Sequence, residues 1–200
     1  HGGQEGRFFH GYYGHYCYMP LYIFAGDELL WAQLRPANTD GAEGTVGAIA
    51  RIVARIRQRW PTVRFIVRGD SGFARDDLMH WCEQNRVDYV LGLARNKRLH
   101  AEIDELLSRA KAEHENSGEA VRFFKDFRYR TLDTWSCERR VVGKAEYLPG
   151  KENPRFVVTS LSVKEYSAQQ LYEELYCARG DMENRIKEQQ LGLFADRTSA

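Results

Sequence analysis

The spacing of hydrophobic and polar positions predicts a β-hairpin followed by a helix near the start of the chain. Residues 15–24 and 28–35 are rich in aromatic and β-branched side chains, and the turn sequence Gly26-Asp27 separates them. Apolar residues then recur at spacings of three and four, the period of an amphipathic helix, at Val46, Ile49, Val53, Ile56 and Trp60. Asp40 and Glu43 have the spacing of a capping box before this helix.

A second side of that helix is basic. Arg51, Arg55 and Arg59 follow one another at intervals of four residues, and Pro61 ends the helix. Arginines near a helix carboxyl end are favourable, so a solvated basic face is the simplest interpretation.

The middle of the chain alternates between strand and helix patterns. Strands are predicted at 63–69 and 87–95, and helices at 74–86 and 97–114. This alternation is typical of parallel strands joined by helical crossovers. The helical period then disappears, and residues 118–160 read as strands alone, so we expect an all-β insertion there. Ser167 is placed to cap a last helix over about 168–190.

Composition argues against several classes of protein but does not indicate a binding partner. Lys and Arg number 29 and Asp and Glu 28, so a net charge of +1 gives no overall basic field. The four cysteines are scattered with no CxxC pair, which argues against a disulfide framework or a zinc site. No apolar run has the length of a membrane span. The chain starts at His1 without Met, so we expect it to be a piece of a longer protein.

The first candidate for chemistry is Asp70, at the carboxyl end of a predicted parallel strand. Open α/β sheets collect ligands and catalytic groups at this edge. Gly69 and Gly72 flank it and allow a sharp turn. The alternative is a loop aspartate that bonds its own backbone, a common use of Asp beside Gly.

The second candidate is a charged stripe on the last helix. At about 100° per residue, one helix face carries an aromatic, a guanidinium, a carboxylate, an ammonium and an amide: Tyr176, Arg179, Glu183, Lys187 and Gln190. These side chains could form salt bridges worth a few tenths of a kcal/mol. Apolar residues of the same helix show that it packs, so the charges lie beside a buried stripe. A carboxylate between two cations stays ionised, as a hard metal ion requires.

These motifs resemble a known family. Tyr176-x2-Arg179-x3-Glu183 is similar to the Y-x2-R-x3-E-x6-K signature of bacterial insertion-sequence DDE transposases. The surrounding GDMENRIKEQQLGLFADRTS, the opening HGGQEGRFFHGYYGHYCYMPLYIFAGDELL and the strand end RGDSGFAR resemble the thirteen-eighty group of these elements. The resemblance extends over essentially the whole chain, with the motifs in the family's order.

The resemblance implies an α/β, RNase H-like catalytic core, residues 1–117 and 161–200, interrupted by the β-strand insertion 118–160. It assigns Asp70 and Glu183 as the second and third acids of a catalytic triad that binds two Mg²⁺ ions, with Mn²⁺ as a substitute. Tyr176 and Arg179 match residues that contact the transposon end. The last signature position is Gln190 instead of Lys, and Lys187 lies one turn earlier on the same face.

The implied activity is metal-dependent cleavage of DNA and strand transfer at transposon ends. Its partners would be double-stranded DNA (terminal inverted repeats and target DNA) and a second copy of the chain in the synaptic complex, with no membrane. The place of action would be the bacterial cytoplasm, at the nucleoid. The first acid is expected upstream of His1, so this chain alone is expected to be inactive. Two alternatives are a transposase-derived DNA-binding module without chemistry and another RNase H-fold nuclease.

Overall fold

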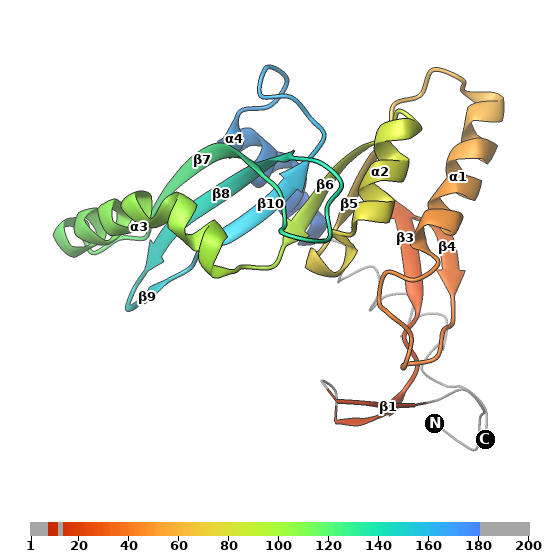
Figure 1. Cartoon of the computed structure of the whole chain (residues 1–200), viewed down its shortest axis with the longest axis horizontal. Coiled ribbons are helices and arrows are strands. Elements are labelled where there is room, and N and C mark those ends of the chain that lie inside the picture. Colours follow the sequence, from red (N-terminus) through yellow and green to blue (C-terminus); the bar gives the residue numbers. More distant parts are fainter. Residues whose placement is uncertain (1–7, 12–13, 181–200) are drawn as a thin grey trace. The chain divides into compact units, whose positions relative to one another are not determined.

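A computed structural model describes residues 8–11 and 14–180 (Figure 1). The chain forms two compact units. The sheet unit comprises residues 63–178, and the hairpin unit comprises residues 1–62 with 179–200. Within the described ranges, no helix is long and apolar enough to cross a membrane.

The sheet unit is built on one mixed sheet with the strand order β5-β6-β10-β8-β7, and β9 pairs with β8. The strands are β5 (Ile66–Gly69), β6 (Asp88–Leu93), β7 (Val121–Tyr129), β8 (Arg139–Leu148), β9 (Lys151–Glu152) and β10 (Arg155–Thr159). β5 and β6 pair in parallel, as the strand–helix alternation predicted, and the other pairs are antiparallel. The expected α/β class, with a mixed sheet flanked by helices, is confirmed.

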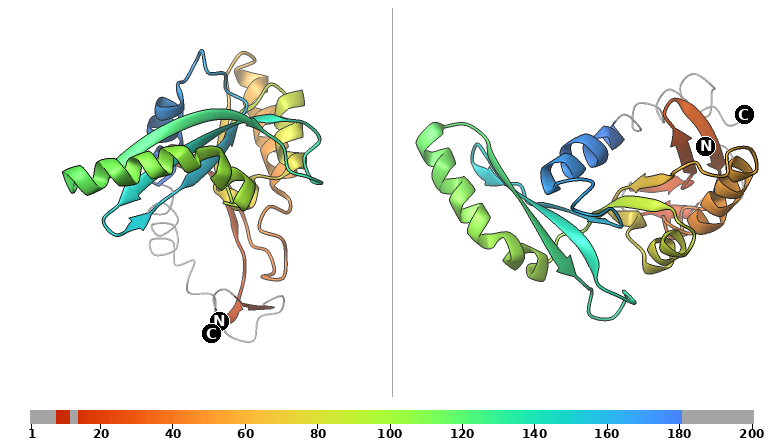
Figure 2. Two further views of the ribbon diagram at one scale, coloured as in Figure 1. Left: turned by 60° about the vertical axis from the view of Figure 1, so that its left-hand side comes forward. Right: turned by 90° about the horizontal axis from the view of Figure 1, so that it is seen from above.

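Helices cover both faces of this sheet (Figure 2). Neighbouring residues of a strand point to opposite faces. A Cβ at Gly143 of β8 would lie 2.7 Å from Ile103 of α3 (Lys97–Ser117), so this face packs against α3. Val142 points the other way, into a core cluster with Leu171 and Tyr172 of the last helix.

The helical segments around the sheet lie close to their predicted positions. The predicted helix 74–86 is α2 (Asp76–Gln84), preceded by the short 3-10 turn η1 (Ser71–Phe73). The last helix starts as predicted, because Ser167 and Gln170 form a capping box. It passes from α4 (Ala168–Gln170) through a π-helical segment η2 (Leu171–Tyr176) to the 3-10 turn η3 (Cys177–Gly180). The predicted continuation to residue 190 lies outside the described residues.

The segment 118–160 contains the strands β7 to β10, as its pattern predicted. These strands are part of the same sheet as β5 and β6, because β10 pairs with β6 from Phe156↔Leu93 to Thr159↔Val90. The proposed boundaries of a separate insertion stay a prediction.

The described part of the hairpin unit contains two antiparallel strand pairs and one helix. The pairs are β1 (Phe8–His10) with β2 (His15–Cys17), and β3 (Leu21–Ala25) with β4 (Glu28–Gln33). The predicted turn at Gly26 is confirmed, with a positive φ of 59° that favours glycine. The helix is α1 (Thr45–Arg59), which buries Ala48, Ile49 and Val53.

The predicted capping box before α1 is wrong. The N-cap is Gly44, with φ 77°, and no side chain caps the helix. The Asp40 carboxylate instead accepts the N–H of Ala42 at 2.8 Å. The buried Arg35 side chain shapes this loop by donating to the carbonyl oxygens of Met19 (3.0 Å), Gly41 (3.1 Å) and Glu43 (2.6 Å).

Candidate functional site

Asp70 follows β5 directly and begins the turn η1. Its carboxylate oxygen Oδ1 accepts the N–H of Gly72 at 2.8 Å, so one oxygen holds the loop in shape. The residue is exposed to solvent. This is the position predicted from the sequence, an acid at the carboxyl end of a parallel strand. The backbone bond expected of a loop aspartate is present as well.

Three glycines pack tightly around the Asp70 loop. A Cβ at Gly69 would lie 3.1 Å from Phe73 and 3.2 Å from Leu91, and one at Gly72 would lie 3.0 Å from Oδ1 of Asp70. A Cβ at Gly92 of β6 would lie 3.0 Å from the Ser71 backbone nitrogen. The loop therefore lies against the sheet with no room for a side chain at these glycines, and the hydrogen bond from the Gly72 N–H orients the Asp70 carboxylate.

Tyr176, which lies much later in the sequence, also packs against Gly92 beside the Asp70 loop. Its hydroxyl oxygen lies 2.6 Å from the position that a Cβ of Gly92 would occupy. The same position is 3.2 Å from the carbonyl carbon of Asp70. The fold thus brings two of the predicted site residues, Asp70 and Tyr176, to the carboxyl ends of β5 and β6.

The π-helical segment η2 is held on this face of the sheet by polar and aromatic contacts. The Arg68 guanidinium of β5 donates to the carbonyl oxygen of Leu175 at 3.1 Å. The Tyr172 and Tyr176 rings are tilted against each other with centroids 5.5 Å apart, and the Lys144 ammonium lies 5.3 Å from the Tyr172 centroid. A π turn inside a helix is rare and is frequently found at functional sites. Here it lies in the segment that ends at Tyr176.

An ionic cluster whose Lys144 and Glu146 side chains are buried lies beneath the same helix. The Arg122 guanidinium pairs with Glu173 of η2 at 3.1 Å and with Glu146 of β8 at 3.5 Å. Lys144 and Asn153 also donate to Glu146. Burial alone would raise the pKa of Glu146, but the hydrogen bonds from Lys144 and Asn153 outweigh it and lower that pKa. The cluster ties η2 to the sheet, and no sequence motif predicted it.

A second buried ionic cluster ties β8 to α2, the helix that follows the Asp70 loop. The Arg139 guanidinium donates to Asp76 at 2.7 Å and to Glu83 at 2.7 Å. Ser136 donates its N–H and its hydroxyl to Asp76, and the Tyr89 hydroxyl donates to Glu83 at 2.6 Å. The sequence of β8 contains an indication of this cluster. Successive side chains of a strand alternate between its two faces, so Arg139 lies on the same face as Val141 and Gly143.

The remaining predicted site residues are not placed. Glu183, Lys187 and Gln190 lie outside the described residues. Arg179 belongs to the turn η3, and its side chain is not described. Among the described residues there is no group of three or more His, Cys, Asp or Glu side chains that could hold a metal ion.

Comparison with protein families shows which family the chain belongs to. A family model described as transposase DDE domain group 1 matches residues 1–200. The chain belongs to this family. No curated protein matches the chain. The mixed sheet flanked by helices is consistent with the RNase H-like fold of DDE transposases, whose members act on DNA.

DDE transposases generally use divalent metal ions, and Asp70 has the chemistry of one ligand. Hard cations prefer carboxylate oxygens, and the Asp70 carboxylate is exposed on a rigid loop with Oδ1 bonded to Gly72. Asp70 therefore offers a carboxylate oxygen of the kind that such an ion prefers.

Proposed function

We propose that this chain is the catalytic domain of a bacterial insertion-sequence DDE transposase, which cleaves transposon ends and transfers the strands to target DNA. The observation that carries the proposal is the meeting of Asp70 and Tyr176 at Gly92, on the strand ends where an α/β sheet collects catalytic groups. Both residues belong to motifs recognised in the sequence.

Asp70 and Glu183 are the proposed metal ligands. Asp70 offers its carboxylate from a loop that the contacts of Gly69, Gly72 and Gly92 hold against the sheet. Glu183 is proposed from its place in the sequence signature that also contains Tyr176 and Arg179. When bound, two Mg²⁺ ions, or Mn²⁺ in their place, would activate the attacking oxygen and stabilise the leaving oxygen of a phosphodiester.

The proposed contacts with DNA come from Tyr176, Arg179, Lys187 and Gln190. The Tyr176 hydroxyl lies beside the Asp70 loop, so a DNA strand that contacts Tyr176 would bring its phosphates close to the metal ligands. The proposed partners are double-stranded DNA, at the terminal inverted repeats and at the target, and a second copy of the chain in a synaptic dimer. The proposed place of action is the bacterial nucleoid.

The proposed domain organisation is an RNase H-like core, 1–117 and 161–200, with 118–160 as a β insertion. The strand content of 118–160 supports it, as does the return of the chain to helix at Ser167. The insertion would then extend the core sheet, because its strand β10 pairs with β6.

The test is cleavage of transposon-end DNA by the full-length protein that carries this chain. Asp70→Asn and Glu183→Gln should each abolish Mg²⁺-dependent cleavage and leave end binding largely intact. Asp77→Asn is the matched control, because Asp77 is also exposed and also accepts a backbone N–H, that of Leu78 at 2.8 Å. This control should cleave normally.

Two outcomes would overturn the proposal. Cleavage by the Asp70→Asn variant at the wild-type rate would remove Asp70 from the metal site. Specific end binding by a wild-type protein that never cleaves, with Mg²⁺ or Mn²⁺, would favour a DNA-binding module without chemistry.

A further inference from the structure

Helix α1 of the hairpin unit has an unbalanced charge. Its fifteen residues include four arginines and no acidic residue. Arg51, Arg55 and Arg59 are exposed and follow one another at intervals of four. Residues four apart lie on the same side of a helix, about 6 Å apart along its axis. The three guanidinium groups thus form a row about 12 Å long, which we call the arginine row.

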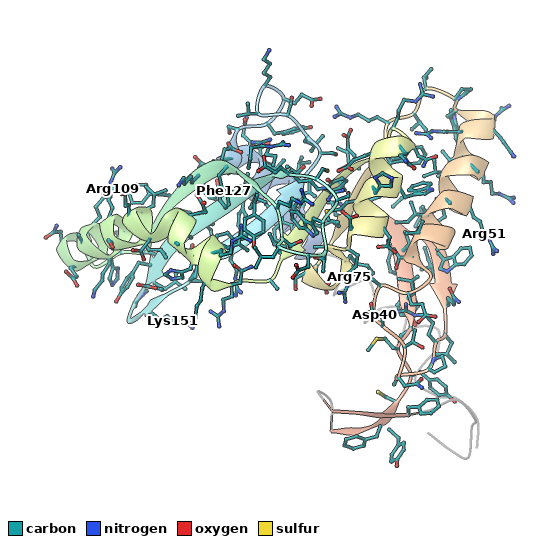
Figure 3. The ribbon with its side chains drawn as sticks, viewed as in Figure 1. Asp40, Arg51, Arg75, Arg109, Phe127 and Lys151 are labelled. Carbon is teal, nitrogen blue, oxygen red and sulfur yellow. The ribbon has the colours of Figure 1, made fainter. Side chains whose placement is uncertain are left out.

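Another side of α1 is anchored in the hairpin unit. Ile49 and Val53 on that side are buried, with 5% and 4% of their surface exposed. This burial fixes which side of the helix faces solvent. The arginine row is therefore presented to solvent by a packed helix (Figure 3, where Arg51 is labelled).

No carboxylate of the described residues pairs with the arginine row. The Arg51 guanidinium lies 5.8 Å from the centroid of the Trp31 ring on β4, and this contact orients the side chain without neutralising its charge. Arg55 and Arg59 form no ion pair within the described ranges. Positive charges at this spacing repel one another, which destabilises the helix.

Helix α3 of the sheet unit provides a comparison, because its charged side chains are of both signs and form ion pairs. It contains four Lys or Arg residues and five Asp or Glu residues. Its Arg109 pairs with Glu113 at 2.9 Å, His100 lies 3.7 Å from Asp104, and Glu102 pairs with Lys125 of β7. The charges of α3 are thus balanced by neighbouring side chains, whereas the arginine row of α1 pairs with no carboxylate in the described part of the chain.

We propose that the arginine row of α1 binds the phosphate backbone of double-stranded DNA without reading its sequence. The planar guanidinium suits phosphate oxygens, and a row on a rigid helix can follow one strand of a duplex. The choice of DNA as the anion rests on the proposed function. The apolar side of α1 is already buried, so insertion into a lipid surface is not open to this helix.

The proposal gives the protein two kinds of DNA contact. The Tyr176 region would recognise the transposon end beside the metal ligands, and the arginine row would add affinity for any duplex. Removing a phosphate contact weakens binding by the same factor for every DNA sequence. Each such contact contributes about 0.9 to the slope of log affinity against log salt concentration.

The experiment measures binding of the full-length protein to a transposon-end duplex and to an unrelated duplex over a series of salt concentrations. The variant R51Q/R55Q/R59Q should bind both duplexes roughly 10- to 100-fold more weakly at low salt, and its salt slope should fall by about 2.7. R51K/R55K/R59K keeps the charges and should keep most of the slope. Circular dichroism and thermal unfolding verify that the variants fold.

The matched control is K111Q/K151Q/K164Q, which removes the same charge from three exposed lysines scattered over the sheet unit. It should change the slope much less. Equal effects of the two triple variants, or no effect of the arginine variant, would overturn the inference while the proposed function stands. Stronger binding to anionic vesicles than to either duplex would also overturn it. A wild-type protein that binds no duplex would refute both proposals.

Discussion

Two regions of the sheet unit use charged side chains in opposite ways. Strand β8 carries Arg139, Arg140, Lys144 and Glu146 in buried positions, and each has its polar partners within the fold. The end of β5 carries Asp70, which is exposed and uses one oxygen on its own loop. Charges on β8 hold elements together, whereas the charge of Asp70 is available to a ligand.

The buried charges of β8 join three layers of the unit. Arg140 donates to Asp126 of β7 at 2.6 Å and to the carbonyl oxygens of Leu161 and Tyr166. Arg139, whose side chain is 2% exposed, reaches α2 on the opposite face. Breaking a buried pair by removing one partner leaves an uncompensated charge, and that is costly. Substitutions in the two regions should therefore differ in their effects on stability and on activity.

The largest expected loss of stability comes from Arg139→Leu. The change leaves Asp76 and Glu83 without their guanidinium partner, and we expect the free energy of unfolding to fall by about 3–5 kcal/mol. Urea denaturation measures it. Arg109→Gln is the control, because it breaks the exposed pair with Glu113 and should cost under about 1 kcal/mol. Equal losses in the two variants would mean that the Arg139 cluster contributes no more to the free energy of unfolding than an exposed ion pair does.

Acidification should weaken the same cluster. Burial alone would raise the pKa values of Asp76 and Glu83, but the hydrogen bonds of these carboxylates, including those from Arg139, outweigh it and lower both pKa values. Groups with a lowered pKa in the folded state stabilise the protein above their ordinary pKa values, 3.8 for Asp and 4.5 for Glu. That stability is lost as the pH falls through the folded-state values.

Thermal unfolding between pH 7 and pH 3 measures this loss. The melting temperature of the wild type should fall steeply below about pH 4.5. The Arg139→Leu variant should start lower and fall less, because its carboxylates have lost that partner. A parallel decline in both proteins would contradict the role given to Arg139.

A smaller effect is expected where Tyr176 meets the sheet. Gly92→Ala places a Cβ 2.6 Å from the Tyr176 hydroxyl and 3.0 Å from the Ser71 backbone nitrogen, so we expect a loss of about 1–3 kcal/mol. Adding Tyr176→Phe removes the hydroxyl and should recover part of the loss. Gly47→Ala in α1 is the control, because its Cβ meets nothing within 4 Å and it should stabilise the helix. Additive effects of Gly92→Ala and Tyr176→Phe would argue against the contact.

Local patterns predicted the elements well, because they depend on neighbouring residues. The period of α1, the turn at Gly26 and the helix cap at Ser167 are all local features, and the structure confirms them. The capping box before α1 was wrong for a tertiary reason. The Arg35 side chain binds the carbonyl oxygens of that loop, and the helix begins after Gly44.

The candidate site was predictable only in its parts. Asp70 was found from its place at a strand end and Tyr176 from a helical stripe and a signature. Their approach at Gly92 depends on the parallel pairing of β5 with β6, which the strand–helix alternation predicted, and on the π turn of η2, which no local pattern predicted. The ionic clusters of Arg139 and Glu146 were missed because isolated charges in a strand usually indicate a solvated face.

The smallest effect on stability is expected from Asp70→Asn, and it sharpens the comparison most. The amide oxygen of Asn can still accept the Gly72 N–H, so the free energy of unfolding should change by less than about 0.5 kcal/mol. Asp76→Asn, which removes a charged partner of Arg139, should cost clearly more. If Asp70 is a metal ligand, Mg²⁺ or Mn²⁺ should raise the melting temperature of the wild type and of Asp77→Asn, because a bound ion stabilises the folded state. The Asp70→Asn variant should lose that increase while keeping its own stability. An equal increase in all three proteins would place the ion elsewhere.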